Sequence, residues 1–106
     1  MIKKLLFIFF LGSALVGYSQ AKSIDKLAAA PNPFTNNTNI TFTTTNTSTI
    51  ILNVRNVLGK VVFKKSYKTK IGKNTITFYK NDLATGIYVY SIQDKKKIIS
   101  KRFVIQ

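Results

Sequence analysis

The sequence contains no cysteine, histidine, tryptophan or glutamate, and its only acidic residues are Asp25, Asp82 and Asp94. Without cysteine the chain has no disulfide, no thiolate metal site, no thiol nucleophile and no attachment point for an N-terminal lipid. Without histidine it lacks the commonest general base and transition-metal ligand. Three scattered carboxylates do not suit a two-carboxylate hydrolase or a calcium cage. We therefore expect no catalytic residue, no cofactor and no metal site, and a protein that is not an enzyme.

The chain is short and strongly basic. Its 106 residues suggest a single domain. Lysine and arginine number 17 against 3 acidic residues, which gives a formal net charge of +14. A charge of this size bears on solubility and on attraction to anionic partners, and it does not by itself specify a fold.

The N-terminus has the pattern of a secretory signal peptide. Lys3 and Lys4 precede an apolar run from Leu5 to Val16. A membrane-spanning helix needs about 20 apolar residues, so this run is too short to be one, and small residues follow it. We expect a signal peptide over residues 1–19 with cleavage before Gln20, although cleavage after Ala21 fits about equally well. The alternative is an N-terminal anchor that is not cleaved. In the mature chain we expect no transmembrane span.

A leader and a proline-rich boundary follow the signal. Residues Gln20 to Ala30 show little pattern, and we expect a short flexible leader there, with a helical turn as the alternative because alanine and leucine favour helix. Pro31-Asn32-Pro33-Phe34 marks the boundary, because proline fixes φ and cannot donate a ladder hydrogen bond. Such a segment belongs at the start of a strand or at a sheet edge.

The chain after Phe34 alternates between apolar and polar residues. Residues 27–54 carry no charge and are rich in threonine and asparagine, yet the alternation favours ordered strands over a disordered tract. Glycine-containing turns separate the apolar runs. Tyr88, Tyr90 and Ile92 oppose Ile87 and Val89, so that strand should be central. The expected strands are Ile40–Thr43, Ile50–Arg55, Val61–Tyr67, Thr75–Tyr79, Ile87–Gln93 and Lys97–Ile105.

This spacing predicts an all-β fold. Short strands every 10–13 residues, with no amphipathic helix after Pro31, indicate an immunoglobulin-like antiparallel β-sandwich of about six to seven strands. A β-barrel is the alternative.

The basic residues allow three interpretations. Lysines and aromatic residues intermix from Arg55 onward, as they do in nucleic-acid-binding proteins. A signal peptide places the mature chain outside the cytoplasm, and lysine, which outnumbers arginine 15 to 2, is the weaker choice for bidentate phosphate recognition. We therefore expect no nucleic-acid partner. A solvated surface that discourages aggregation, and attraction to anionic lipopolysaccharide or polysaccharide, are the remaining interpretations.

Four motifs, in order, carry a family resemblance. They are Pro31-Asn32-Pro33-Phe34 followed by the strand Asn39–Phe42, the hairpin around Leu58-Gly59, the segment Leu83–Tyr90 with Gly86 and Tyr88, and a terminal strand bearing Lys97, Lys101 and Arg102. Together they resemble the C-terminal sorting domain of the type IX secretion system (type A, also called the Por secretion system), which is found in Bacteroidota. The resemblance covers residues 31–106, after the signal at 1–19 and the leader at 20–30.

The resemblance implies a non-enzymatic export address on an immunoglobulin-like sandwich. Such domains are recognised by translocation components, cross the outer membrane and meet a sortase-like peptidase. The implied location is the periplasm in transit and then the cell surface or the medium. The physical properties of the chain suit such an interaction module, because a terminal strand with Lys97, Lys101 and Arg102 offers a partner both edge hydrogen bonds and charge, the mode of β-strand addition. The sorting-motif residues that the resemblance implies are Pro31, Asn32, Pro33, Phe34, Leu58, Gly59, Gly86, Tyr88, Lys97, Lys101 and Arg102.

The short span between signal and domain suggests a second hypothesis. Only Gln20 to Ala30 separates the expected signal from Pro31, whereas family members carry a cargo domain there. The chain could therefore come from a truncated gene, or be a free-standing sorting-like domain. It could also be a surface β-sandwich that binds anionic polysaccharide or lipopolysaccharide.

Overall fold

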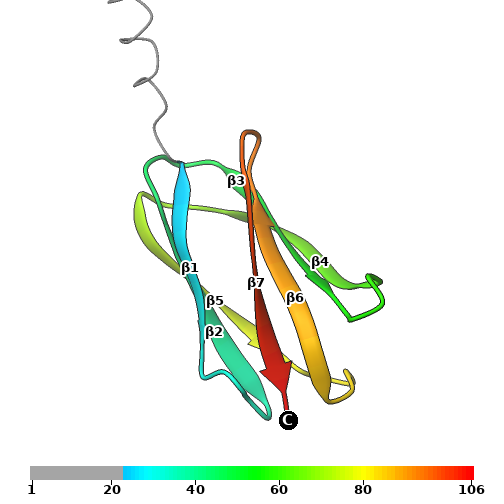
Figure 1. The fold of residues 1–106 in the computed structure, drawn as a ribbon. Coiled ribbons are helices and arrows are strands. Elements are labelled where there is room, and N and C mark those ends of the chain that lie inside the picture. Colours follow the sequence, from blue (N-terminus) through cyan, green and yellow to red (C-terminus); the bar gives the residue numbers. More distant parts are fainter. Residues whose placement is uncertain (1–22) are drawn as a thin grey trace, which may run out of the picture.

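The computed structural model describes residues 23–106, drawn in colour in Figure 1. The expected signal peptide, residues 1–19, lies outside the described residues. The part of the chain that the structure describes contains strands and turns but no helix, and so no helix that could span a bilayer.

Seven strands make up most of the described residues. Their bounds are β1 (Ile24–Ala30), β2 (Asn37–Thr44), β3 (Thr49–Arg55), β4 (Val61–Lys68), β5 (Gly72–Tyr79), β6 (Gly86–Gln93) and β7 (Ile98–Ile105). The strands belong to two sheets, with the order β1-β2-β5 in one and β4-β3-β6-β7 in the other. Every pairing between these strands is antiparallel, so the all-β antiparallel prediction is confirmed.

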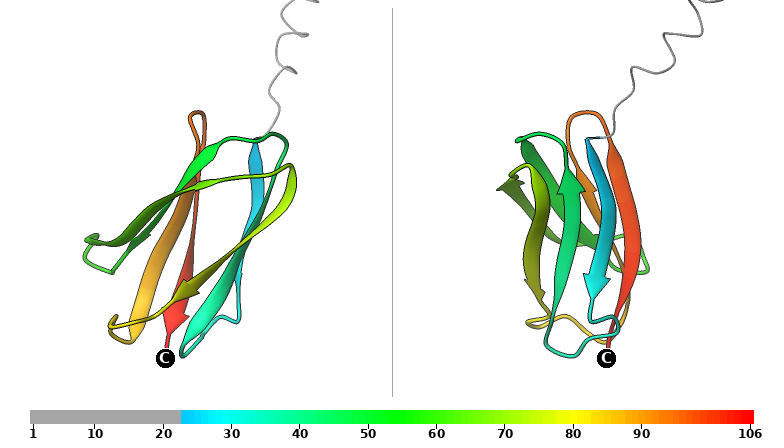
Figure 2. Two further views of the ribbon diagram at one scale, coloured as in Figure 1. Left: turned by 180° about the vertical axis from the view of Figure 1, so that it is seen from behind. Right: turned by 90° about the vertical axis from the view of Figure 1, so that its left-hand side faces the viewer.

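The two sheets face each other, as both views in Figure 2 show, and their inward side chains form one core. Period-two alternation produces this core, because every second residue of a strand points to the same face. The central position predicted for Ile87–Gln93 is confirmed, since β6 lies between β3 and β7. The fully buried side chains include Ile40, Phe42, Ile50, Leu52, Val54, Tyr90, Ile92, Phe103 and Ile105.

Strand β1 differs from the sequence-based expectation. Residues 24–30, expected to be part of a flexible leader, pair with β2 as the edge of the three-stranded sheet. The pairing shifts register between Asp25 and Ala28, and Lys26 has a positive φ of 56°. This bulge brings Ile24 and Leu27, three residues apart, onto the same buried face. Buried residues that are three positions apart do not match the period of two that marks a regular strand. The alternation pattern therefore did not predict β1.

Candidate functional site

The expected sorting motifs gather at one end of the two sheets. Because consecutive strands alternate in direction, β1, β3, β5 and β7 all run downward in Figure 1; β1, β5 and β7 finish at the lower end and β3 finishes at the right, part of the way down. We call this end the motif end. It comprises loops 31–36, 56–60 and 80–85 and the C-terminal Gln106. Of the expected motif residues, Lys97 lies at the opposite end, where β7 begins.

The Pro31–Phe34 segment is held against the outer edge of β7. The Asn32 side chain donates from Nδ2 to the Arg102 carbonyl at 3.2 Å and accepts at Oδ1 from the Val104 N–H at 2.9 Å. The Phe34 N–H then donates to the Val104 carbonyl at 3.0 Å, and the Gln106 N–H donates to the Phe34 carbonyl at 2.8 Å. We call these four hydrogen bonds the Asn32–Phe34 clasp. The clasp agrees with the predicted place of this segment at a sheet edge.

Phe34 also anchors the segment in the core. Its side chain is 2% exposed and meets Phe103 edge-to-face, with the ring centroids 5.1 Å apart. A second edge-to-face contact joins it to Phe78 at 6.4 Å. Aromatic pairs in this arrangement add to the free energy gained from burial alone. The segment therefore links β7 of the four-stranded sheet to β5 of the three-stranded sheet. Pro31, Pro33, Asn36 and Gln106 line an open hollow beside it.

The Leu58-Gly59 motif forms the tip of the β3–β4 hairpin. Asn56 organises this turn, because its Oδ1 accepts from the N–H of Leu58 at 2.9 Å and of Lys60 at 3.0 Å. Gly59 has φ of 86°, a conformation that favours glycine. Leu58 itself projects into solvent and is 88% exposed. In this motif, glycine shapes the turn while leucine presents an apolar side chain.

The Gly86 and Tyr88 motif fixes the β5–β6 connection. Gly86 opens β6 with φ of 150°, and Tyr88, two residues later, lies in the core. The Tyr88 hydroxyl reaches back to donate to the Ala84 carbonyl at 2.7 Å. The tyrosine thus ties the turn to the core, and both residues serve the local fold.

The three basic residues expected on the terminal strand do not form one cluster. The ammonium of Lys97 donates to the Ile24 carbonyl at 3.0 Å and joins the start of β7 to β1. Lys101 and Arg102 are both exposed, and as neighbours in a strand they point to opposite faces of the sheet. The Asn32–Phe34 clasp already occupies the β7 edge near its C-terminal end. This part of the edge therefore cannot accept an added strand while the clasp is closed.

At the end opposite the motif end, the carboxylate of Asp94 accepts hydrogen bonds that hold the β6–β7 turn. Burial raises the pKa of Asp94, but hydrogen bonds from the Ser23 hydroxyl and from the N–H groups of Lys96 and Lys97 outweigh it, so the pKa is lowered overall. Within residues 23–106, no three acidic side chains come together as metal ligands would. The role of Asp94 in the described structure is to organise the β6–β7 turn.

Exposed apolar side chains form a feature that sequence reasoning missed. At the motif end they are Val57, Leu58, Val61, Tyr79 and Ile87, whereas Ile71 and Ile98 lie elsewhere. Alternation marks such residues as strand formers, but it cannot show which of them remain uncovered. Exposed apolar groups in one region are typical of an interaction surface.

Comparisons with known proteins bear on the family of the chain. A search of the curated proteins gave no match. The family model for the secretion system C-terminal sorting domain matches residues 28–106, which is most of the chain. The chain therefore belongs to the family of type IX secretion system C-terminal sorting domains.

Proposed function

We propose that this chain is a non-enzymatic address that directs what is attached to it across the outer membrane through type IX secretion. The observation that carries this is the family match over residues 28–106, which includes every strand from β2 to β7. The arrangement of loops 31–36, 56–60 and 80–85 at the same end of their strands supports it, because three of the separate motifs lie at that end.

The proposal also covers the route that the chain takes, the components that recognise it and the fold that it uses. The N-terminal segment, residues 1–19, directs entry into the periplasm, and the folded domain is then recognised by translocation and sortase components. The facing sheets form an immunoglobulin-like sandwich, and the product reaches the cell surface or the medium. The domain contributes binding rather than chemistry in this role.

A reporter fusion tests the proposal. A periplasmic reporter is inserted ahead of Lys22 and expressed in a host with type IX secretion, beside the same reporter on an established sorting domain. We expect the reporter in the medium or on the cell surface. Its retention in the periplasm, while the established domain is exported, would contradict the proposal. A host strain without the translocation machinery is the negative control, and export from that strain would also count against the type IX route.

A further inference from the structure

The outer face of the four-stranded sheet has a composition of its own. We call it the four-strand face and define it by the outward-pointing residues of β3, β4, β6 and β7. Strand register sets its members in rows across the sheet. From one end to the other, the rows are Ser66–Ile51–Gln93–Ile98, Lys64–Asn53–Ser91–Ser100, Val61–Arg55–Val89–Arg102 and, at the motif end, Ile87–Val104.

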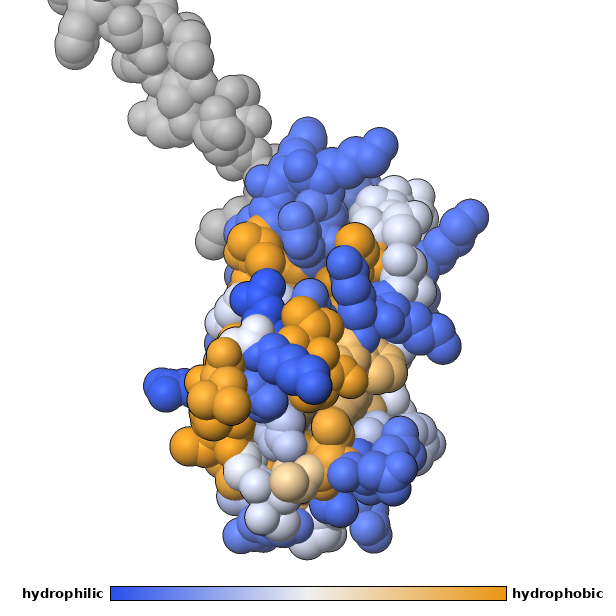
Figure 3. Space-filling model, turned by 90° about the vertical axis from the view of Figure 1, so that its right-hand side faces the viewer, coloured by the Kyte–Doolittle hydropathy of each residue, from blue (hydrophilic) through white to orange (hydrophobic). Residues whose placement is uncertain are grey.

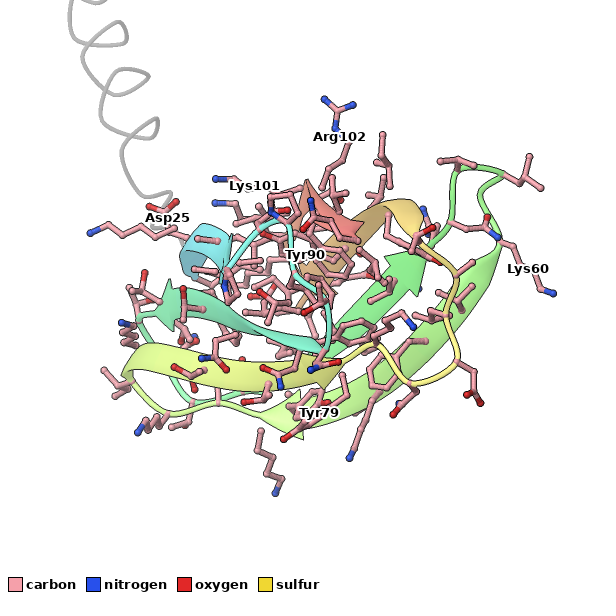
Figure 4. The ribbon with its side chains drawn as sticks, turned by 90° about the horizontal axis from the view of Figure 1, so that it is seen from below. Asp25, Lys60, Tyr79, Tyr90, Lys101 and Arg102 are labelled. Carbon is pink, nitrogen blue, oxygen red and sulfur yellow. The ribbon has the colours of Figure 1, made fainter. Side chains whose placement is uncertain are left out.

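One row of this face contains both arginines of the chain. Arg55 on β3 and Arg102 on β7 each pair with Val89 on β6, from opposite sides. Two strand spacings, about 10 Å, therefore separate their Cα atoms. Both side chains are exposed, and Figure 4 shows Arg102 pointing away from the body of the domain. In a chain with 15 lysines, the only two guanidinium groups thus share one row of one face.

Apolar side chains lie within this row and on its side toward the motif end, whereas the row on its other side is polar. Val89 lies between the arginines, and Ile87 and Val104 form the next row toward the motif end. Ile87 is 47% exposed and Val61 is 44% exposed, so neither is covered by the fold. Figure 3 shows this side of the molecule, where hydrophobic residues occupy much of the middle and hydrophilic ones lie above and beside them. Apolar residues with arginine among them are the composition of a protein interface.

A buried acceptor lies in the neighbouring row. Asn53 Oδ1 is shielded from water and has no hydrogen-bond partner within the described residues. Its neighbour in register, Ser91, is only 5% exposed. A buried acceptor without a donor costs free energy within the domain itself. What the face offers to a partner is therefore apolar contact and two charged forks, while the Asn53 acceptor stays covered by its neighbours.

The charge of the face defines its occupant. None of the three acidic residues lies in β3, β4, β6 or β7, so the arginines and Lys64 are not balanced by an acidic residue of these strands. A second copy of the chain would bring like charges together, so it does not fit. Guanidinium groups bind carboxylates in a bidentate manner, and lysine cannot replace them in that geometry.

We propose that the four-strand face docks a protein surface that places carboxylates on either side of an apolar patch. The Arg55–Val89–Arg102 row forms its centre. This inference rests on the proposed function, since the partner is then a protein met during export. A polyanion such as lipopolysaccharide fits less well, because it would bind the lysines of every face equally and would leave the apolar residues uncovered.

Paired substitutions in the reporter fusion test this inference. R55Q/R102Q removes both guanidinium groups, and R55K/R102K keeps the charge without the fork. The matched control, K70Q/K73Q, removes the same charge from exposed residues of the β4–β5 turn and β5. We expect R55Q/R102Q to lower the exported share about tenfold and R55K/R102K to lower it severalfold, because interface arginines are often hot spots. K70Q/K73Q should stay within about twofold of wild type. Thermal unfolding of each variant checks whether the fold is kept.

The possible outcomes separate the inference from the proposed function. Export of R55Q/R102Q at the wild-type level overturns the docking face and leaves the proposed function standing. Equal losses for R55Q/R102Q and K70Q/K73Q mean general attraction to a polyanion, and they overturn the inference as well. Retention of the wild-type fusion overturns the proposed function itself, and this is seen before any variant is compared.

Discussion

The Asn32 side chain bonds to the backbone of Val104, accepting its N–H at 2.9 Å, although the two residues are 72 positions apart. The same amide donates to the Arg102 carbonyl at 3.2 Å. One side chain thus offers the donor and acceptor that a neighbouring strand would offer with its backbone. Edge strands expose such groups and tend to pair with other chains. In the Asn32–Phe34 clasp, residues of the same chain occupy the hydrogen-bonding groups of this part of the β7 edge. Another chain therefore cannot pair with the edge there.

Asn32→Ala should destabilise the domain by about 1 kcal/mol, the usual net contribution of a hydrogen bond with access to water. Urea unfolding measures the change. Asn36→Ala is the matched control, because Asn36 is exposed in the same loop and bonds to Lys80 through its backbone carbonyl. We expect the control to stay within about 0.5 kcal/mol of wild type. Equal stability of the two variants would mean that the two hydrogen bonds of the Asn32 side chain contribute nothing measurable.

The sequence predicted the place of this segment but not its partner. Two prolines around one residue exclude a central strand, so a sheet edge follows from covalent geometry. Which edge it meets depends on the packing of β7, a strand about seventy residues later. Likewise, the bulge at Lys26 removed the alternation that revealed the other strands. Local patterns therefore predicted six strands, whereas β1 and the clasp could be recognised only from the tertiary structure.

We expect substitutions of Leu58 and Gly59 to have different effects, because Leu58 is exposed for contact whereas Gly59 shapes the turn. Gly59→Ala places a side chain at φ of 86°, and we expect a loss of about 1 kcal/mol of stability. Leu58→Ser changes a side chain that is 88% exposed, so stability should stay within about 0.5 kcal/mol. If this leucine contacts the export machinery, Leu58→Ser lowers export of the reporter fusion while its thermal unfolding is unchanged. A Leu58→Ser variant that is exported normally would restrict the motif to shaping the hairpin.

Deletion of residues 97–106 should unfold the domain. The deletion removes β7, and with it Phe103 and Ile105, which are 0% and 1% exposed. Each large side chain of this kind contributes roughly 2–5 kcal/mol, comparable with the whole stability of a small domain. We expect the truncated chain to lose its cooperative unfolding transition in circular dichroism. Loss of export by this truncation therefore says nothing about recognition, unless the truncated chain still unfolds cooperatively.

The candidate site was predictable only in part, for a topological reason. Alternating strand direction brings every second turn to one end, so the meeting of residues 31–34, 58–59 and 83–86 follows from the strand count. The Arg55–Val89–Arg102 row depends on two registers between strands distant in sequence. A shift of one residue in either register would turn an arginine to the other face. Local sequence could therefore indicate the motif end but not the four-strand face.

The domain should lose stability in acid through Asp94, because hydrogen bonds hold the pKa of this carboxyl below its usual value in the folded state. The unfolded chain then binds a proton more readily than the folded one. The stabilisation is complete above the unfolded pKa, about 3.9, and is lost as the pH falls through the lower folded pKa. Asp94→Asn keeps the shape but cannot titrate. We expect the free energy of unfolding of wild type to fall more steeply below about pH 4 than that of Asp94→Asn.

Urea unfolding at a series of pH values between neutrality and about pH 2 measures this difference. Asp82→Asn is the matched control, because it removes one carboxylate from an exposed turn at the other end of the domain. A profile that flattens in Asp94→Asn but not in Asp82→Asn assigns the acid sensitivity to the Ser23, Lys96 and Lys97 hydrogen bonds. Equal flattening in both variants would instead trace it to the overall repulsion of a chain that carries a net charge of +14.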